Sequence, residues 1–122
     1  MEENNKRVET LKKIIDYTRP SNKKVNWKRE KAINGIVYNC KFNPLQSINS
    51  NYFITVDPEL SRMIVYRFTD TIEFGPKFNS YETAIIKDFI KELDEYFESI
   101  EKTNEDNLLS VINDELRNFK VI

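Results

Sequence analysis

The strongest constraint on the fold is a run of apolar residues at helical spacing between residues 80 and 102. It comprises Tyr81, Ile85, Ile86, Phe89, Ile90, Leu93, Tyr96, Phe97 and Ile100. Steps of three and four residues place these side chains on one face of a helix of about six turns. Such a stripe needs a second layer to cover it, because burial of each large side chain contributes about 1.5 to 3 kcal/mol. The pattern therefore predicts a core-forming helix at 80–102.

The residues around this helix indicate where it begins and ends. Asn79 or Ser80 can cap its first turn, and Glu82, three residues after Asn79, is close to a capping-box arrangement. Thr103 or Asn104 interrupts the apolar pattern, so we expect a separate helix at 105–119. The apolar positions of this last helix are Leu108, Leu109, Ile112, Leu116 and Phe119.

The middle of the chain, residues 34–75, has the alternating pattern of a sheet. Strands are predicted at 35–42, 51–56 and 62–68, with a shorter one at 71–74. Asp57 and Pro58 suit a type I turn, which makes the second and third strands a hairpin. Apolar spacing also predicts a helix at 2–17, closed by Arg19 and Pro20. The predicted fold class is α+β: this N-terminal helix, a three- or four-stranded antiparallel sheet, and two C-terminal helices packed on one sheet face.

The length of 122 residues suits one domain, and we interpret 1–122 as a single α+β domain. Histidine is absent and Cys40 is the only cysteine, which excludes histidine-dependent nucleophiles, imidazole zinc ligands and a disulfide within the chain. Carboxylate pairs such as Glu92 and Glu95 lie on a predicted solvent face, where no apolar pocket raises a carboxyl pKa. We therefore expect a non-enzymatic protein with no catalytic residues, no metal site and no cofactor.

The chain has no apolar run of the length of a signal peptide or a membrane span. A single cysteine fits a reducing compartment, so we expect a cytoplasmic protein without membrane contact. Asn, Ile, Lys, Phe and Tyr are abundant, while Ala and Gly are scarce. This composition is typical of an AT-rich genome, and it suggests a phage or a mobile element as the source. The oligomeric state stays open at this point.

The net charge of −1 hides an uneven distribution along the chain. Residues 1–41 hold eleven Lys and Arg against five Asp and Glu, whereas residues 78–122 hold five against eleven. If the fold keeps these regions apart, one surface would attract an anionic partner and the other a cationic partner.

The basic part is concentrated in a polar connector at 19–32, between the first helix and the sheet. Its candidate nucleic-acid-binding residues are Lys23, Lys24, Trp27, Lys28, Arg29 and Lys31. Cations beside an indole can follow a phosphate backbone while the ring stacks on a base. The alternative interpretation is a solvated loop whose Trp27 is anchored in the core.

The acidic part lies on the solvent face of the helix at 80–102. Its candidate partner-binding residues are Asp88, Glu92, Asp94, Glu95, Glu98 and Glu101. Rows of carboxylates can imitate a nucleic acid backbone and occupy a basic protein surface. The alternative is the ordinary polar face of an amphipathic helix.

These observations lead to a function hypothesis with two alternatives. The leading hypothesis is a small binding protein, an inhibitor of the anti-CRISPR or anti-defence type, whose acidic helical face occupies a basic surface of a host nucleic-acid-handling protein. The first alternative is an accessory protein that binds nucleic acid through the connector at 19–31. The second is an immunity protein that neutralises a toxin.

Overall fold

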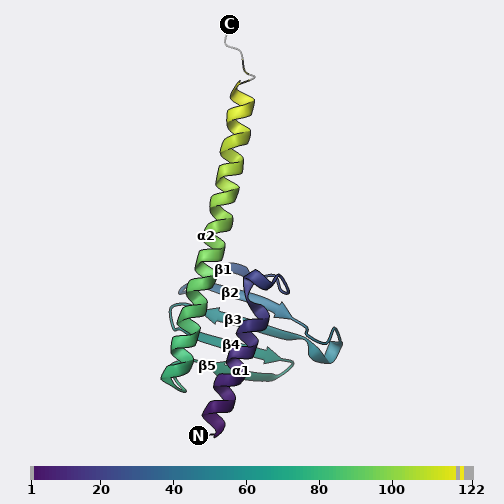
Figure 1. Cartoon of the computed structure of the whole chain (residues 1–122), viewed down its shortest axis with the longest axis vertical. Helices are drawn as coiled ribbons and strands as arrows, with labels where there is room; N and C mark the ends of the chain where they lie inside the picture. The colour runs from purple at the N-terminus through teal and green to yellow at the C-terminus, as the bar shows by residue number, and fades with distance from the viewer. Residues whose placement is uncertain (1, 118, 120–122) are drawn as a thin grey trace.

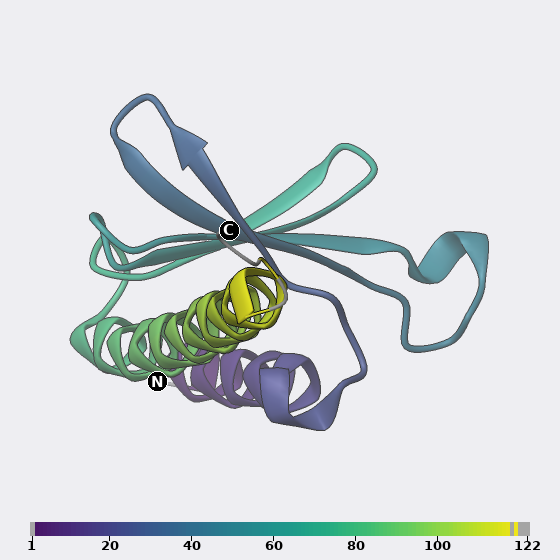
Figure 2. The same cartoon turned by 90° about the horizontal axis from the view of Figure 1, so that it is seen from above.

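A computed structural model describes residues 2–117 and 119 as one α+β domain built of two layers. A five-stranded antiparallel sheet forms one layer, and two helices cover one of its faces (Figure 2). The helices are α1 (Glu2–Thr18) and α2 (Ser80–Arg117). The strands are β1 (Lys28–Ala32), β2 (Gly35–Phe42), β3 (Tyr52–Asp57), β4 (Arg62–Arg67) and β5 (Asp70–Phe74). The predicted class, the N-terminal helix and the placement of the helices on one sheet face are confirmed.

The strands follow one another in the order β1-β2-β3-β4-β5, and each pairs with the next. The hairpin of β3 and β4 closes as predicted, because Asp57 Oδ1 accepts a hydrogen bond from the amide of Glu59 at 3.1 Å. Gly75, which follows β5, has a φ of 143°, and a Cβ there would lie 2.9 Å from the carbonyl oxygen of Ser61. Glycine is therefore required where the chain leaves the sheet for α2.

The predicted count of three or four strands is wrong, because the sheet has five. The extra strand, β1, lies inside the segment predicted as a connector, and it pairs with β2 from Lys28↔Asn39 to Ala32↔Gly35. Four of its five residues are exposed, so this edge strand lacks the apolar alternation by which a strand is recognised. The weaker prediction of a short strand at 71–74 corresponds to β5.

The prediction of two C-terminal helices is also wrong, because α2 is continuous over 38 residues. Thr103 does not cap a new helix; its hydroxyl donates to the carbonyl of Ser99, four residues back, at 2.9 Å. This bond is compatible with an uninterrupted helix. Residues 80–117 also contain neither Gly nor Pro, the two residues that end helices most effectively. A break in the apolar periodicity near Thr103 therefore does not mean that the helix ends there.

The core lies between the helices and the covered sheet face. From α2 it takes Ile86, Phe89, Ile90 and Leu93, which are at most 8% exposed. α1 contributes Leu11 and Ile15. From the sheet come Tyr38, Cys40, Phe42, Ile54, Val56, Met63, Val65 and Phe74. Alternate residues of β2, β3 and β4 thus face the helices, and the residues between them face the open side.

The start of α2 is held by a buried ion pair. Asn79 caps the helix by accepting a hydrogen bond from the Glu82 amide at 2.8 Å, as predicted, and its side-chain amide donates to the Glu82 carboxylate at 2.7 Å. Glu82 is fully buried, and Arg7 of α1 pairs with it at 2.8 Å. The Arg7 guanidinium also lies over the rings of Phe74 and Phe78. One cation thereby ties α1, β5 and α2 together.

Candidate binding surface on the open sheet face

The acidic residues of α2 are partly engaged within the domain. Glu92 pairs with Arg19, and Glu101 pairs with Arg29 of β1 at 3.1 Å. Asp94 accepts a hydrogen bond from the buried hydroxyl of Tyr38. Burial and this bond to an anionic acceptor raise the pKa of Tyr38, so the phenol stays protonated. These three carboxylates stabilise the packing of α2 on the rest of the domain.

The other three acidic candidates, Asp88, Glu95 and Glu98, are exposed on α2. Lys87 and Lys91, which are also exposed, interrupt this row of carboxylates. The free part of the acidic face is therefore smaller and more mixed in charge than the sequence pattern indicates.

The basic connector divides in a similar way. Trp27 is 7% exposed, its ring packs edge-on against Phe89, and its Nε1 donates to the carbonyl of Thr18 at 2.6 Å. The structure therefore corresponds to the alternative interpretation of this residue: the indole is anchored in the core and is not placed to stack on a base. Arg29 points to the helix side and pairs with Glu101. Lys31, two residues on, has the same orientation and is exposed.

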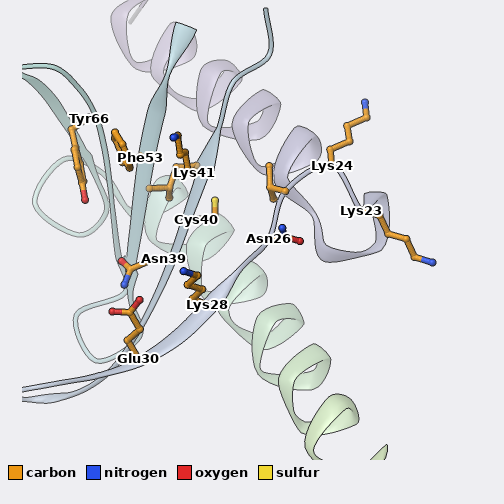
Figure 3. A pocket seen from close by; sticks show the side chains of 12 residues that line it. Lys23, Lys24, Asn26, Lys28, Glu30, Asn39, Cys40, Lys41, Phe53 and Tyr66 are labelled. Carbon is orange, nitrogen blue, oxygen red and sulfur yellow. The ribbon is translucent and has the colours of Figure 1, made fainter. Parts of the chain in front are cut away.

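The remaining connector cations lie together with residues that the sequence interpretation did not select. Lys28 faces the open side of the sheet, opposite Asn39 of β2, and Lys23 and Lys24 precede it where the chain leaves α1. With Lys41, Phe53 and Tyr66 they line one hollow in the surface, but the side chains of Lys23 and Lys24 point away from it (Figure 3). The ammonium of Lys24 lies 5.0 Å from the centroid of the Tyr17 ring. We call this region the open-face site.

The aromatic part of the open-face site is a stacked pair. Phe53 of β3 lies directly opposite Tyr66 of β4, and their ring centroids are 5.6 Å apart with an interplanar angle of 17°. Phe53 is 40% exposed and Tyr66 is 36% exposed, although both are in central strands. Lys41 is opposite Phe53 on β2, with its ammonium 5.8 Å from the ring centroid. A cation and two aromatic rings thus form one row across three strands.

A second row crosses the sheet beside the first. Lys28, Asn39 and Thr55 occupy consecutive paired positions on β1, β2 and β3. The hydroxyl of Thr55 donates to Asn39 Oδ1 at 2.8 Å. The amide nitrogen of Asn39 is a separate donor that this bond does not use. Glu30 is the acidic residue at the rim of the hollow.

The hollow between these groups has a volume of about 560 Å³. It forms where β1 separates from β2, since the pairing begins at Lys28 and the preceding residues turn away toward α1. Val25, Asn26, Cys40 and Ile54 complete its lining. The site therefore combines apolar ring surface and amide groups with Lys28 and Lys41 in a concave region.

Cys40 is the nucleophilic side chain nearest the hollow. It is 7% exposed, and burial raises the pKa of its thiol to about 12. At neutral pH it is therefore a protonated thiol that contributes to packing, in line with its position between the buried Tyr38 and Phe42 on β2.

Among the described side chains, those of residues 6–117 and 119, no group of three or more Asp, Glu, Cys or His residues is placed to hold a metal ion. Neither described helix has an apolar segment long enough to cross a membrane.

Phe53, Tyr66 and Lys41 were missed because an aromatic residue in a strand is usually assigned to the core. The hairpin register could have revealed them. Phe53 and Tyr66 are equally distant from the Asp57–Arg62 pair that closes the turn, so they lie opposite each other. They are next to the buried Ile54 and Val65 along their strands, so both point to the other face of the sheet.

Comparison of the chain with known protein families, with characterised proteins and with solved structures gave no match. These comparisons give no support to the predicted phage origin or to the predicted inhibitory role. Any function must therefore be argued from the surfaces themselves.

Proposed function

We propose that the protein binds single-stranded nucleic acid on the open face of its sheet. The observation that carries the proposal is the exposed Phe53–Tyr66 stack, which lies in the middle of an uncovered sheet beside Lys41. Aromatic rings on a surface accept bases of any sequence, because every base has a flat apolar face. Each such stacking contact contributes about 1 to 3 kcal/mol.

The lysines supply the second part of the interaction. Lys28 and Lys41 lie on the same sheet face as the rings. Lys23 and Lys24 border the hollow, but their side chains point away from it, so they can contribute only longer-range attraction. A strand whose bases stack at the rings can place its phosphates along this side of the sheet, where each contact releases a condensed counterion. Asn39, next to Lys28 in the second row, offers its amide to a base edge or a phosphate.

The proposal is restricted to single strands for a physical reason. In a duplex the faces of the bases are covered by their neighbours, so short side chains on a sheet cannot stack on them. Unpaired bases expose both faces and can extend the Phe53–Tyr66 stack at an outer ring face.

The test is a titration followed by fluorescence anisotropy, with labelled single-stranded DNA and RNA of about twenty nucleotides and a duplex of the same length. We expect binding of the single strands and much weaker binding of the duplex. Phe53→Ala and Tyr66→Ala should each weaken binding by about 5- to 150-fold, which corresponds to the loss of one stacking contact. A matched control is Tyr81→Ala, which removes an aromatic ring that is 76% exposed on the helix layer.

Salt dependence tests the role of the lysines. Lys28→Ala and Lys41→Ala should each lower the slope of log affinity against log salt by about 0.7, the value for one lost phosphate contact with a single strand. Thermal unfolding of each variant checks that the fold is retained. Absence of single-strand binding at low salt, or an equal loss of affinity in Tyr81→Ala, would contradict the proposal.

The acidic helix face is a second candidate, favoured by the exposure of Asp88, Glu95 and Glu98. We propose that this acidic face binds a basic protein surface. Replacing Glu95 and Glu98 with Lys should then slow association strongly, whereas Phe53→Ala should have no effect on that complex. A pull-down with the wild-type chain, with this double variant and with Phe53→Ala distinguishes the two surfaces.

A further inference from the structure

The last part of α2 lies outside the domain. Figure 1 shows that α2 crosses the sheet from β5 to β1 and then continues past this edge strand. The ion pair between Arg29 of β1 and Glu101 marks the point where the helix leaves the sheet. Every residue from Glu101 to Arg117 is exposed. We call residues 101–117 the free segment of α2.

The free segment carries large apolar side chains. They are Leu108, Leu109, Val111, Ile112 and Leu116, which are between 41% and 63% exposed, and Phe119, just after the helix, is 68% exposed. Leu109, Ile112 and Leu116 are separated by steps of three and four residues, the spacing of the seam in a two-stranded coiled coil. Isolated exposed apolar residues are ordinary on a protein surface, but a contiguous stripe of this kind marks an interaction site.

From this stripe we propose that the free segment pairs with the same segment of a second copy of the chain. The stripe is self-complementary, as a two-fold interface requires, because two identical seams can bury each other. Its surroundings carry little charge: from Leu108 to Arg117 the charged residues are Asp114, Glu115 and Arg117. Asp114 and Arg117 form an ion pair at 3.9 Å. They lie two residues after Ile112 and one after Leu116, on the side of the helix away from the seam.

Charge also decides against other occupants. Residues 101–117 contain five acidic and two basic residues, so the segment repels nucleic acid and anionic lipid surfaces. The same excess of negative charge weakens the pairing of two copies, so the dimer should be favoured by added salt. A basic partner helix would find few acidic residues beside the apolar stripe itself, because most of the acidic residues precede Leu108.

The pairing of two copies does not have to supply the free energy that nucleates a helix. The free segment continues α2, which is already formed over the sheet. The polar residues 101–107 separate the stripe from the domain by about 10 Å of helix. A seam this short buries less than the roughly 1,200 to 2,000 Å² of a stable interface, so we expect a reversible dimer that forms as concentration rises.

The test is sedimentation velocity of the full chain over about two decades of concentration into the high micromolar range. The mass should rise from that of the 14.6 kDa monomer toward twice this value. Leu109→Asp combined with Leu116→Asp should raise the dissociation constant about tenfold or more. Ser110→Asp is the matched control, because it adds a charge to the same turn on the side away from the seam, and it should leave the dissociation constant unchanged.

Both variants should keep the circular dichroism spectrum of the dilute wild-type chain, since Leu109 and Leu116 are more than half exposed and do not belong to the core. A chain that stays monomeric at every concentration would overturn the proposal. So would a dimer that persists in the Leu109/Leu116 variant, because that dimer would use another surface. Assemblies larger than a dimer would likewise contradict a single two-fold seam.

Discussion

The two parts of α2 have similar apolar side chains but very different environments. In the part over the sheet, residues 80–100, Ile86 and Leu93 are fully buried and Phe89 is 2% exposed. In the free segment, Leu108 is 60% exposed and Leu116 is 63% exposed. Both parts belong to one uninterrupted helix. Helical periodicity therefore predicts which side chains share a face, but not whether anything covers that face.

The difference arises from the relative lengths of the two layers. Five strands about 4.8 Å apart span roughly 20 to 25 Å, whereas a helix of 38 residues is about 57 Å long. The sheet can cover only the first part of α2, even allowing for the angle at which the helix crosses it. Apolar residues over the sheet stabilise the fold, and those beyond it are available to a partner.

The largest effect is expected in the part of α2 over the sheet. Phe89→Ala removes a ring that packs against Trp27 in the core and should lower the free energy of unfolding by about 3 to 5 kcal/mol. Urea denaturation followed by circular dichroism measures this loss. An unchanged midpoint would mean that the covered part of α2 does not carry the core.

The next effect concerns the ion pair that holds the start of the helix. Arg7→Met removes the cation from fully buried Glu82 and should cost about 2 to 4 kcal/mol, because a carboxylate is left without its partner. Urea denaturation followed by circular dichroism measures this loss. An unchanged midpoint would mean that the Arg7–Glu82 pair does not hold the start of α2.

A smaller effect is expected from Tyr38→Phe. The variant keeps the buried ring stacked on Phe97 but removes the hydroxyl that donates to Asp94, so it should cost about 1 kcal/mol. Asp94→Asn is the comparison, since an amide oxygen can still accept that bond. A Tyr38→Phe loss as large as that of Phe89→Ala would show that polar bonds, more than apolar burial, anchor α2.

The smallest effect is expected in the free segment. Leu108→Ser and Leu116→Ser, measured with dilute protein, should each change the free energy of unfolding by less than about 0.5 kcal/mol. Their side chains are more than half exposed and make no core contacts that the substitution would remove. A loss near that of Phe89→Ala would remove the distinction between the two parts of the helix.

Much of the fold could be predicted from local patterns. The N-terminal helix, the β3–β4 hairpin, a cap at Asn79 or Ser80 and an apolar stripe on α2 each depend on residues close together in the sequence. Within that predicted stripe, Tyr81, Tyr96 and Ile100 are exposed. β1 was missed although its hairpin with β2 is local, with a turn at Ile33 and Asn34. Four of its five residues are exposed, so the strand lacks the apolar alternation that marks the other strands. The continuity of α2 was missed because the spacing of apolar residues changes near Thr103. The helix propensity of the residues there does not change, since they include neither Gly nor Pro.

The candidate site was predicted only in part. Lys23, Lys24 and Lys28 were selected from charge density and do border the hollow, whereas Trp27 belongs to the core. Strand register brings Lys41, Phe53 and Tyr66 together from three separate segments. The uneven charge along the chain did not become two separate surfaces, because Arg19 and Arg29 pair with Glu92 and Glu101 across the layers.

By itself, the sequence determined what each segment can be: which faces are apolar, where helices begin, and which chemistry the absence of histidine excludes. Only the tertiary structure decided which apolar residues become core. Burial depends on whether another element is long enough to reach a face, and this is a property of the assembled layers. For this reason Phe89 and Leu116, on one helix, have opposite roles, as do Ile54 and Phe53 on one strand.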